Sequence, residues 1–153
     1  MNVSTVNFEV GIPVDSDGYI EMECDFCKNR FMLPSKFFQD DEHLHFFCPI
    51  CGLPNKTNTF YCPEVLEKIE QTAMNYMYRE IEKTLGRTIK GINKSGFIKI
   101  SMDIPKQEPE KELYTPANEY EDVRLNCCNA SVKVQYIDKE IGVYCPLCGD
   151  TKL

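Results

Sequence analysis

The sequence lacks a long apolar run, a basic-then-apolar N-terminus and a recognisable set of catalytic residues. No stretch approaches the ~20 apolar residues of a membrane span, so we expect no membrane partner. Residues 1–10 contain no basic segment followed by an apolar one, so we expect no signal peptide and a cytoplasmic protein. No Gly-rich phosphate loop, Ser/His/Asp set or paired carboxylate stands out, and we therefore expect no enzyme.

The chain also lacks an excess of positive charge. Its net charge is −7 and its pI is about 4.9, which argues against general binding to nucleic-acid backbones. Residues 79–99 differ, with six bases against two acids and a net charge of +4. This segment keeps a nucleic-acid interface open as an alternative to a solvated helix end. Its basic residues are Arg79, Lys83, Arg87, Lys90, Lys94 and Lys99.

Nine of the 153 residues are cysteines, far more than an ordinary chain of this length contains. Paired cysteines in a cytoplasmic protein more often bind metal than form disulfides. An odd number of cysteines also fits a pure disulfide scheme poorly. We therefore read the paired cysteines as metal ligands.

The first candidate site has the pattern C-x2-C-x20-C-x2-C. Its ligands would be Cys24, Cys27, Cys48 and Cys51. Two cysteines separated by two residues, with Pro between them and Gly after them, can form a tight turn that directs both sulfurs to one point. A module of about 35 residues cannot bury enough apolar surface alone, and zinc ligation supplies on the order of 10 kcal/mol. The pattern predicts a structural Zn²⁺ site.

The second candidate site repeats this turn but departs from the pattern before it. Its ligands would be Cys127, Cys128, Cys145 and Cys148. Adjacent residues tend to point apart, so two neighbouring ligands require an unusual backbone. The alternative is three thiolates with a fourth position open to water, Cys62 or a partner group. With both sites filled, the chain would bind two Zn²⁺ ions.

The two cysteine sets resemble those of zinc ribbons, which are small β modules found in transcription factors and many accessory proteins. The resemblance covers residues 19–55 and, less well, 122–152. It implies a three-stranded ribbon around a structural zinc and does not imply one function. The Cys-Pro-Leu-Cys-Gly turn also resembles the second clamp of rubredoxin, an iron electron carrier. Rubredoxin has Gly after its first clamp, where this chain has Lys28 and Asn129.

Periodicity predicts an α+β fold with one amphipathic helix, a strand and an acidic, Pro-containing linker. Together with the resemblance, this implies two small zinc-ribbon-like β modules joined by these segments. We expect a hairpin of residues 3–14 and 19–23, and a helix over 64–85 that Gly86 ends. The other expected strands are 43–47, 97–104, 122–126, 131–136 and 142–144, with a turn at 137–141. The expected domains are 1–62 (hairpin and ribbon), 63–105 (helix and strand), 106–121 (linker) and 122–153 (second ribbon).

The apolar stripe of the helix is wider than a coiled-coil seam. It is expected to pack under both flanking modules, with a homodimer through helix 64–85 as the second option. The predicted function is that of a non-enzymatic adaptor or regulatory protein that docks on a protein partner. The alternatives are a nucleic-acid-binding or transcription-associated ribbon protein and a rubredoxin-like carrier. We expect His43 and His45 to be surface or packing residues, and Cys62 to be a buried filler.

Overall fold

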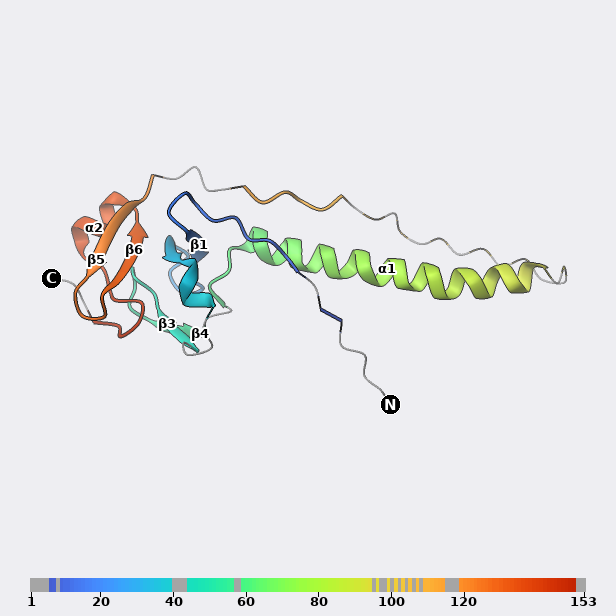
Figure 1. Cartoon of the computed structure of the whole chain (residues 1–153), viewed down its shortest axis with the longest axis horizontal. Coiled ribbons are helices and arrows are strands. Elements are labelled where there is room, and N and C mark those ends of the chain that lie inside the picture. The colour runs from blue at the N-terminus through green and yellow to red at the C-terminus, as the bar shows by residue number, and fades with distance from the viewer. Residues whose placement is uncertain are drawn as a thin grey trace. The chain divides into compact units, whose positions relative to one another are not determined.

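The computed structural model describes residues 6–7, 9–39, 44–56, 59–94, 96, 99, 101, 103, 105, 107, 109–114 and 119–150. The contacts divide the chain into two units. One unit contains Ile12–Val65 and Leu113–Leu153, and the other contains Met1–Gly11 and Leu66–Glu112. The predicted α+β class is confirmed, with small antiparallel sheets and one long helix between the two strand regions in sequence (Figure 1).

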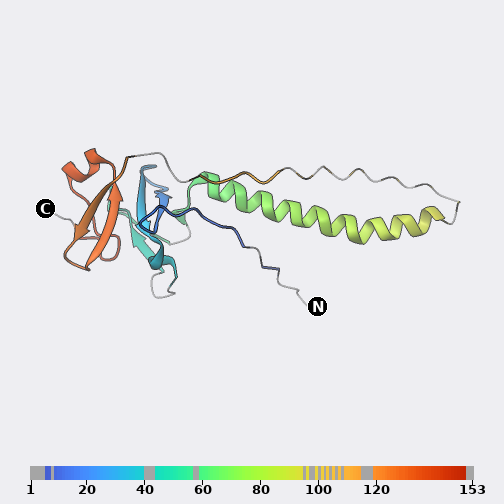
Figure 2. The same cartoon turned by 45° about the horizontal axis from the view of Figure 1, so that its top comes forward.

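The first unit contains a four-stranded antiparallel sheet with the order β1-β2-β6-β5. Its strands are β1 (Tyr19–Glu23), β2 (Arg30–Pro34), β5 (Glu121–Leu125) and β6 (Ala130–Val134). The blue and orange strands lie side by side in Figure 1, and the turned view in Figure 2 agrees. Strands from both ends of the sequence therefore build one sheet.

The two predicted β modules are joined edge to edge in this sheet. In the centre of the sheet, Met32 of β2 pairs with Lys133 of β6. The Tyr19 and Ser131 hydroxyl oxygens are 2.7 Å apart, and one continuous cluster of buried side chains draws on both ribbons. An isolated two-stranded hairpin is only marginally stable in water, and the pairing of β2 with β6 makes a four-stranded sheet with one common buried cluster. The domain boundaries drawn from the sequence stay predictions.

The remaining short elements of this unit are β3 (His45–Phe47), β4 (Pro54–Lys56), a 3₁₀ turn η1 (Ser35–Phe38) and helix α2 (Tyr136–Ile141). Two expectations are wrong here. Residues 137–141 form part of α2 rather than a turn, and residues 142–144 are not a strand. The described part of the expected strand 3–14 is also not a strand, and β1 forms its hairpin with β2.

Helix α1 spans Pro63–Lys94 and is longer than predicted. It begins at Pro63, whose fixed φ suits the first helical turn. Gly86 does not end it, because a glycine costs only about 1 kcal/mol in a helix and the apolar pattern resumes at Ile89 and Ile92. Past the helix, Gly96 has a φ of 78°. The expected strand 97–104 lies largely outside the described residues.

Most of the apolar stripe of α1 is exposed, and its expected packing under both modules stays a prediction. Val65 is buried, whereas Leu66 is 47% and Met77 52% exposed. Ile81 and Leu85 are more than a third exposed as well. The helix thus carries an uncovered apolar face along much of its length.

Candidate metal centres

Two tight turns bring the sulfurs of the first cysteine set together. Cys24 follows β1, and its carbonyl accepts a hydrogen bond from the Lys28 N–H at 2.8 Å. Cys48 follows β3, and its carbonyl accepts one from the Gly52 N–H at 2.9 Å. The four Sγ atoms of Cys24, Cys27, Cys48 and Cys51 all lie within 4.8 Å of one another. The sequence therefore predicted this grouping correctly.

The sulfur spacing of this cluster fits a tetrahedral metal ion. The Cys24 and Cys51 Sγ atoms are 3.8 Å apart, as are those of Cys27 and Cys48. Four thiolates at about 2.3 Å from a zinc ion would be separated by about 3.8 Å along the tetrahedron edges. A disulfide would bring two sulfurs to about 2.05 Å. The residues present therefore fit a four-thiolate site.

The second set is also gathered, including both adjacent cysteines. The Sγ atoms of Cys127, Cys128, Cys145 and Cys148 lie within 4.8 Å of one another, and those of Cys127 and Cys148 are 3.6 Å apart. Asn129 follows the pair with a φ of 48°, and Lys28 has a φ of 59° at the corresponding place after Cys27. Both ribbons thus use the left-handed conformation that Gly would favour, although neither has Gly there.

The two clusters differ in burial. In the first, Cys24 and Cys48 are buried and the other two cysteines are half-buried, whereas in the second only Cys145 is buried. Burial raises the pKa of the Cys48 thiol. Burial would also raise the pKa of Cys24, but the N–H groups of Cys27 and Phe26 outweigh it and lower that pKa. Backbone donors thus favour a thiolate at Cys24 before any cation is considered.

A reciprocal set of contacts joins the two Cys-Pro-x-Cys turns. The Phe47 N–H donates to the Pro146 carbonyl at 2.9 Å, and the Tyr144 N–H donates to the Pro49 carbonyl at 2.8 Å. These four residues hold corresponding places, since an aromatic residue precedes each turn and a proline follows its first cysteine. The turns are thus paired through equivalent atoms, and each supports the other.

The same aromatic residues cover the glycines that end the turns. A Cβ atom on Gly52 would lie 2.9 Å from the Tyr144 ring, and one on Gly149 would lie 2.8 Å from the Phe47 ring. Phe47 and Tyr144 were not singled out from the sequence. The signal was nonetheless present, because the repeated motif is aromatic-Cys-Pro-x-Cys-Gly rather than Cys-Pro-x-Cys-Gly alone.

The other candidate ligands lie outside both clusters. Cys62 is buried, as predicted, and its thiol donates to the Glu21 carbonyl at 3.6 Å. Burial raises its pKa to about 12. His45 is exposed on β3 and belongs to neither cluster, whereas His43 lies outside the described residues.

No family model matches the chain, and no curated protein or solved structure matches it either. Within the part of the chain that the structure describes, none of the helices combines the length and apolar character needed to cross a bilayer. Both cysteine clusters are positioned to bind a metal ion and are consistent with zinc-ribbon-like modules. The geometry alone thus defines the class of site.

Proposed function

We propose that this chain is a non-enzymatic zinc protein whose two structural zinc ions hold a surface that docks on a protein partner. The observation that carries the proposal is the set of four gathered sulfurs at each site. A site closed by four protein ligands offers no open position to a substrate, unlike catalytic zinc sites, which keep one. The ions would therefore stabilise the fold rather than perform chemistry.

Helix α2 supplies the best candidate surface for a protein partner. Its side chains Tyr136, Ile137 and Ile141 are 61%, 59% and 79% exposed. Ile137 and Ile141 are four residues apart and therefore share one face of the helix. Grouped exposed apolar side chains of this kind support a role in contact with another protein.

The docking proposal is tested by capture of partners from the native host. The bait is the full metal-loaded chain, compared with an Ile137→Asp/Ile141→Asp variant and with an Asp138→Asn control on the same helix. A partner enriched by the parent and the control but lost with the double variant would support docking through α2. An identical set of captured proteins from all three baits would reject it.

The metal in this proposal is zinc, and iron is the alternative. Protein purified from the host under reducing conditions should be colourless and contain two zinc ions per chain. A red protein that contains iron would instead indicate an electron carrier and reject the structural role.

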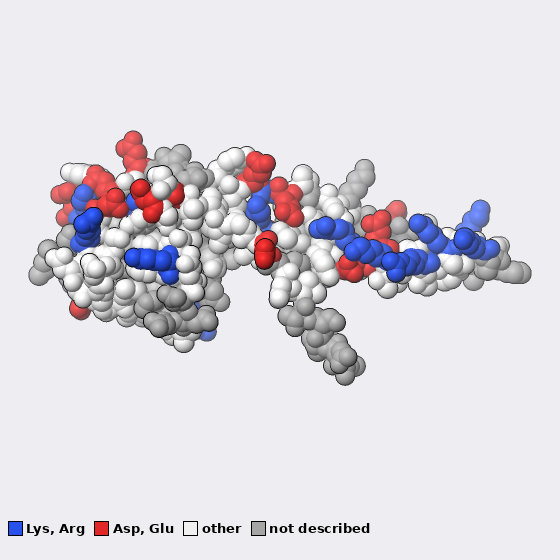
Figure 3. Space-filling view, viewed as in Figure 1, with Lys and Arg blue, Asp and Glu red and all other residues white. Residues whose placement is uncertain are grey.

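A second candidate function is binding to nucleic acid, favoured by one observation on α1. Its exposed bases recur at spacings of four, four, three and four residues, which keeps them on one side of the helix. They are Arg79, Lys83, Arg87, Lys90 and Lys94. Figure 3 shows a row of blue side chains along this part of the helix.

A salt series tests this second candidate. If the row contacts phosphates, the logarithm of the binding constant for random duplex DNA should fall steeply and linearly with the logarithm of salt concentration. Arg87→Gln/Lys90→Gln should reduce that slope by about 2, since two phosphate contacts are lost. Binding that is absent or independent of salt would eliminate the candidate.

A further inference from the structure

We propose that α1 pairs with the α1 of a second copy of this chain in an antiparallel arrangement about Arg79. The first observation is the largely exposed apolar stripe, which runs nearly the whole length of the helix. Its members are Leu66, Ile69, Ala73, Met77, Ile81, Leu85, Ile89 and Ile92. At 1.5 Å per residue, a helix of 32 residues is about 48 Å long. Helices in water depend on tertiary packing for most of their stability, and this one has Gly86 and Gly91 in its interior, each costing about 1 kcal/mol. A partner along the stripe would supply the missing packing.

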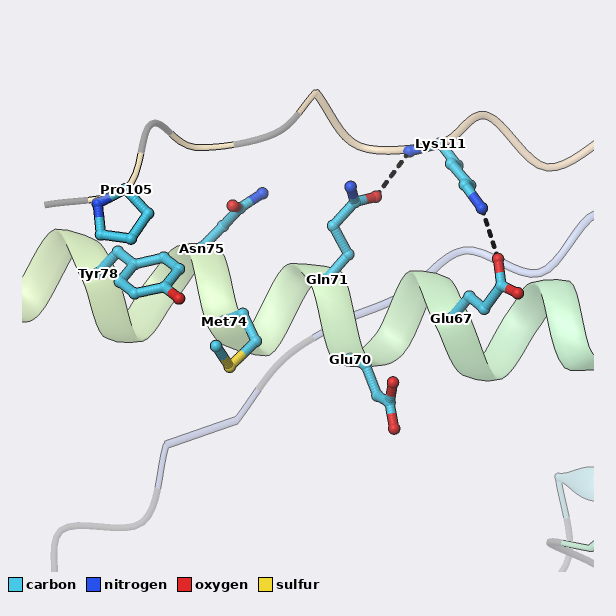
Figure 4. A pocket seen from close by; sticks show the side chains of 8 residues that line it. All are labelled: Glu67, Glu70, Gln71, Met74, Asn75, Tyr78, Pro105 and Lys111. Atoms are coloured by element: carbon cyan, nitrogen blue, oxygen red, sulfur yellow. Dashed lines mark hydrogen bonds and ion pairs between the residues drawn. The ribbon is translucent and has the colours of Figure 1, made fainter.

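A different side of the helix is covered by the chain itself. The Lys111 N–H donates to the Gln71 side-chain oxygen at 3.0 Å, and the Lys111 ammonium group bonds to Glu67. Pro105 lies over the same side, and a groove of about 410 Å³ is left there (Figure 4). The groove is lined by Glu67, Glu70, Gln71, Met74, Asn75, Tyr78, Pro105 and Lys111. Met74 and Tyr78 lie at the edge of the apolar face, and the eight residues paired below are not among those that line this groove.

The stripe is arranged symmetrically about Arg79. Its members lie 2, 6, 10 and 13 residues before and after this position. They pair as Met77 with Ile81, Ala73 with Leu85, Ile69 with Ile89, and Leu66 with Ile92. Two antiparallel copies related by a twofold axis at this level would thus match apolar residues with apolar residues throughout. The mean spacing of about 3.7 residues exceeds the helical repeat and predicts a right-handed wrap.

Charge selects the antiparallel arrangement over the parallel one. Residues 63–78 contain three acids and one base, for a net charge of −2, whereas residues 79–94 contain five bases and two acids, for a net charge of +3. Antiparallel helices place each acidic half beside the basic half of the partner, and parallel helices place like halves together. Opposed helix dipoles favour the same choice. Exposed charges contribute little individually, so their main effect is on orientation.

Light scattering on the full metal-loaded chain tests the association. At micromolar concentration the expected mass is twice the 17.7 kDa of the chain. Met77→Glu/Ile81→Glu should give the mass of one chain with its metal content unchanged. Ile141→Glu places the same acid at an exposed apolar position on α2 and should leave the dimer intact. A single-chain mass for the parent protein, or a dimer that survives the double substitution, would overturn the proposal.

Charge reversal provides a second test that leaves the stripe untouched. Glu67→Lys/Glu70→Lys makes both halves of α1 basic, and Arg87→Glu/Lys90→Glu makes both halves acidic. Each variant alone should dissociate at least tenfold more readily than the parent, and an equimolar mixture should recover the dimer mass. Failure of the mixture to associate better than either variant would contradict the proposal.

Distances between spin labels test the orientation directly. Labels introduced as unnatural amino acids at Lys68 or Arg79 lie on the side opposite the stripe. In the antiparallel pair the two labels at position 79 lie at the same level, whereas those at position 68 are about 33 Å apart along the axis. A parallel pair would give equal distances at both positions and would overturn the assignment.

Discussion

Gly52 and Gly149 lie where the two Cys-Pro-x-Cys turns end and where an aromatic ring from the other turn approaches. Their φ angles are 73° and 77°, in the region that an L-residue enters only at a cost of about 1–2 kcal/mol. The ring atoms lie where a Cβ atom would need space. Each glycine therefore satisfies a conformational and a steric requirement at once.

Gly52→Ala or Gly149→Ala should each lower the free energy of unfolding by about 2 kcal/mol or more, because strain and overpacking act together. Denaturant unfolding of the metal-loaded protein measures the effect. Gly11→Ala is the control, since a Cβ atom there meets nothing within 4 Å. A change below about 0.5 kcal/mol at both turn positions would mean that the turns are not held as described.

Lys133 in the centre of the sheet is buried and bonds to Asp15 and Asp17. Its ammonium group also lies 4.6 Å from the centre of the Tyr19 ring. Burial would lower the pKa of Lys133, but its bonds to the two carboxylates outweigh burial and raise that pKa above the usual value. The charged form thus stabilises the folded state.

Lys133→Met should lower the free energy of unfolding by about 2 kcal/mol near pH 8, because it leaves the largely buried Asp15 carboxylate without its cation. Since the folded pKa is raised, the contribution is complete below the unfolded-state pKa of about 10.4 and is lost as pH rises above it. Denaturant unfolding of both proteins from pH 7 to 11.5 would reveal this. If the difference in unfolding free energy between the parent and Lys133→Met were already falling at pH values under 9, the upward direction of the Lys133 pKa shift would be contradicted.

At the scale of elements, helix α1 continues through a residue that was expected to end it. A Cβ atom on Gly86 would meet nothing within 4 Å, and Gly86 is not among the glycines with positive φ. Ala at this position would therefore fit the helix without strain.

Gly86→Ala should stabilise the C-terminal half of α1 by about 1 kcal/mol. Amide hydrogen exchange of residues 82–94 measures this, with about fivefold slower exchange expected. Gly96→Ala is the contrasting variant, since its φ of 78° makes Ala unfavourable there. Faster exchange in Gly86→Ala would show that the helix ends before this residue.

Local signals in the sequence predicted the local elements and failed for those that depend on distant partners. The cysteine spacing identified both clusters because three of the four cysteine pairs are local C-x2-C motifs and the fourth is an adjacent pair. Helix α2 was missed because its six residues, Tyr136–Ile141, span less than two helical turns, too few for a repeating apolar pattern. The pairing of β2 with β6 joins Met32 to Lys133 across 101 positions of the chain, and no pattern within either strand specifies that partner.

At the scale of the whole molecule, the shared sheet and the reciprocal turns make the two cysteine clusters interdependent. The N–H of Phe47 is held by the second turn and that of Tyr144 by the first. If either turn loses its shape, the other loses a hydrogen bond and an aromatic contact. This contrasts with two ribbons joined only by a linker.

Cys51→Ser and Cys148→Ser should therefore each destabilise the entire sheet rather than one ribbon. Each should show a single unfolding transition at lower denaturant, and the affinity of the intact cluster should fall at least tenfold. Cys62→Ala changes a buried cysteine outside both clusters and should keep both metal ions bound. Separate transitions for the two ribbons, with the unmutated site unaffected, would rule out this coupling.

We expect the fold to depend on metal bound by the two gathered sets of thiolates. Native mass spectrometry of the reduced full chain, before and after treatment with a strong chelator, measures this most directly. The expected result is a chain that carries two zinc ions in a narrow charge distribution, which becomes broad and highly charged as both ions are removed and the fold is lost. A chain that keeps the narrow distribution with no metal bound would contradict it.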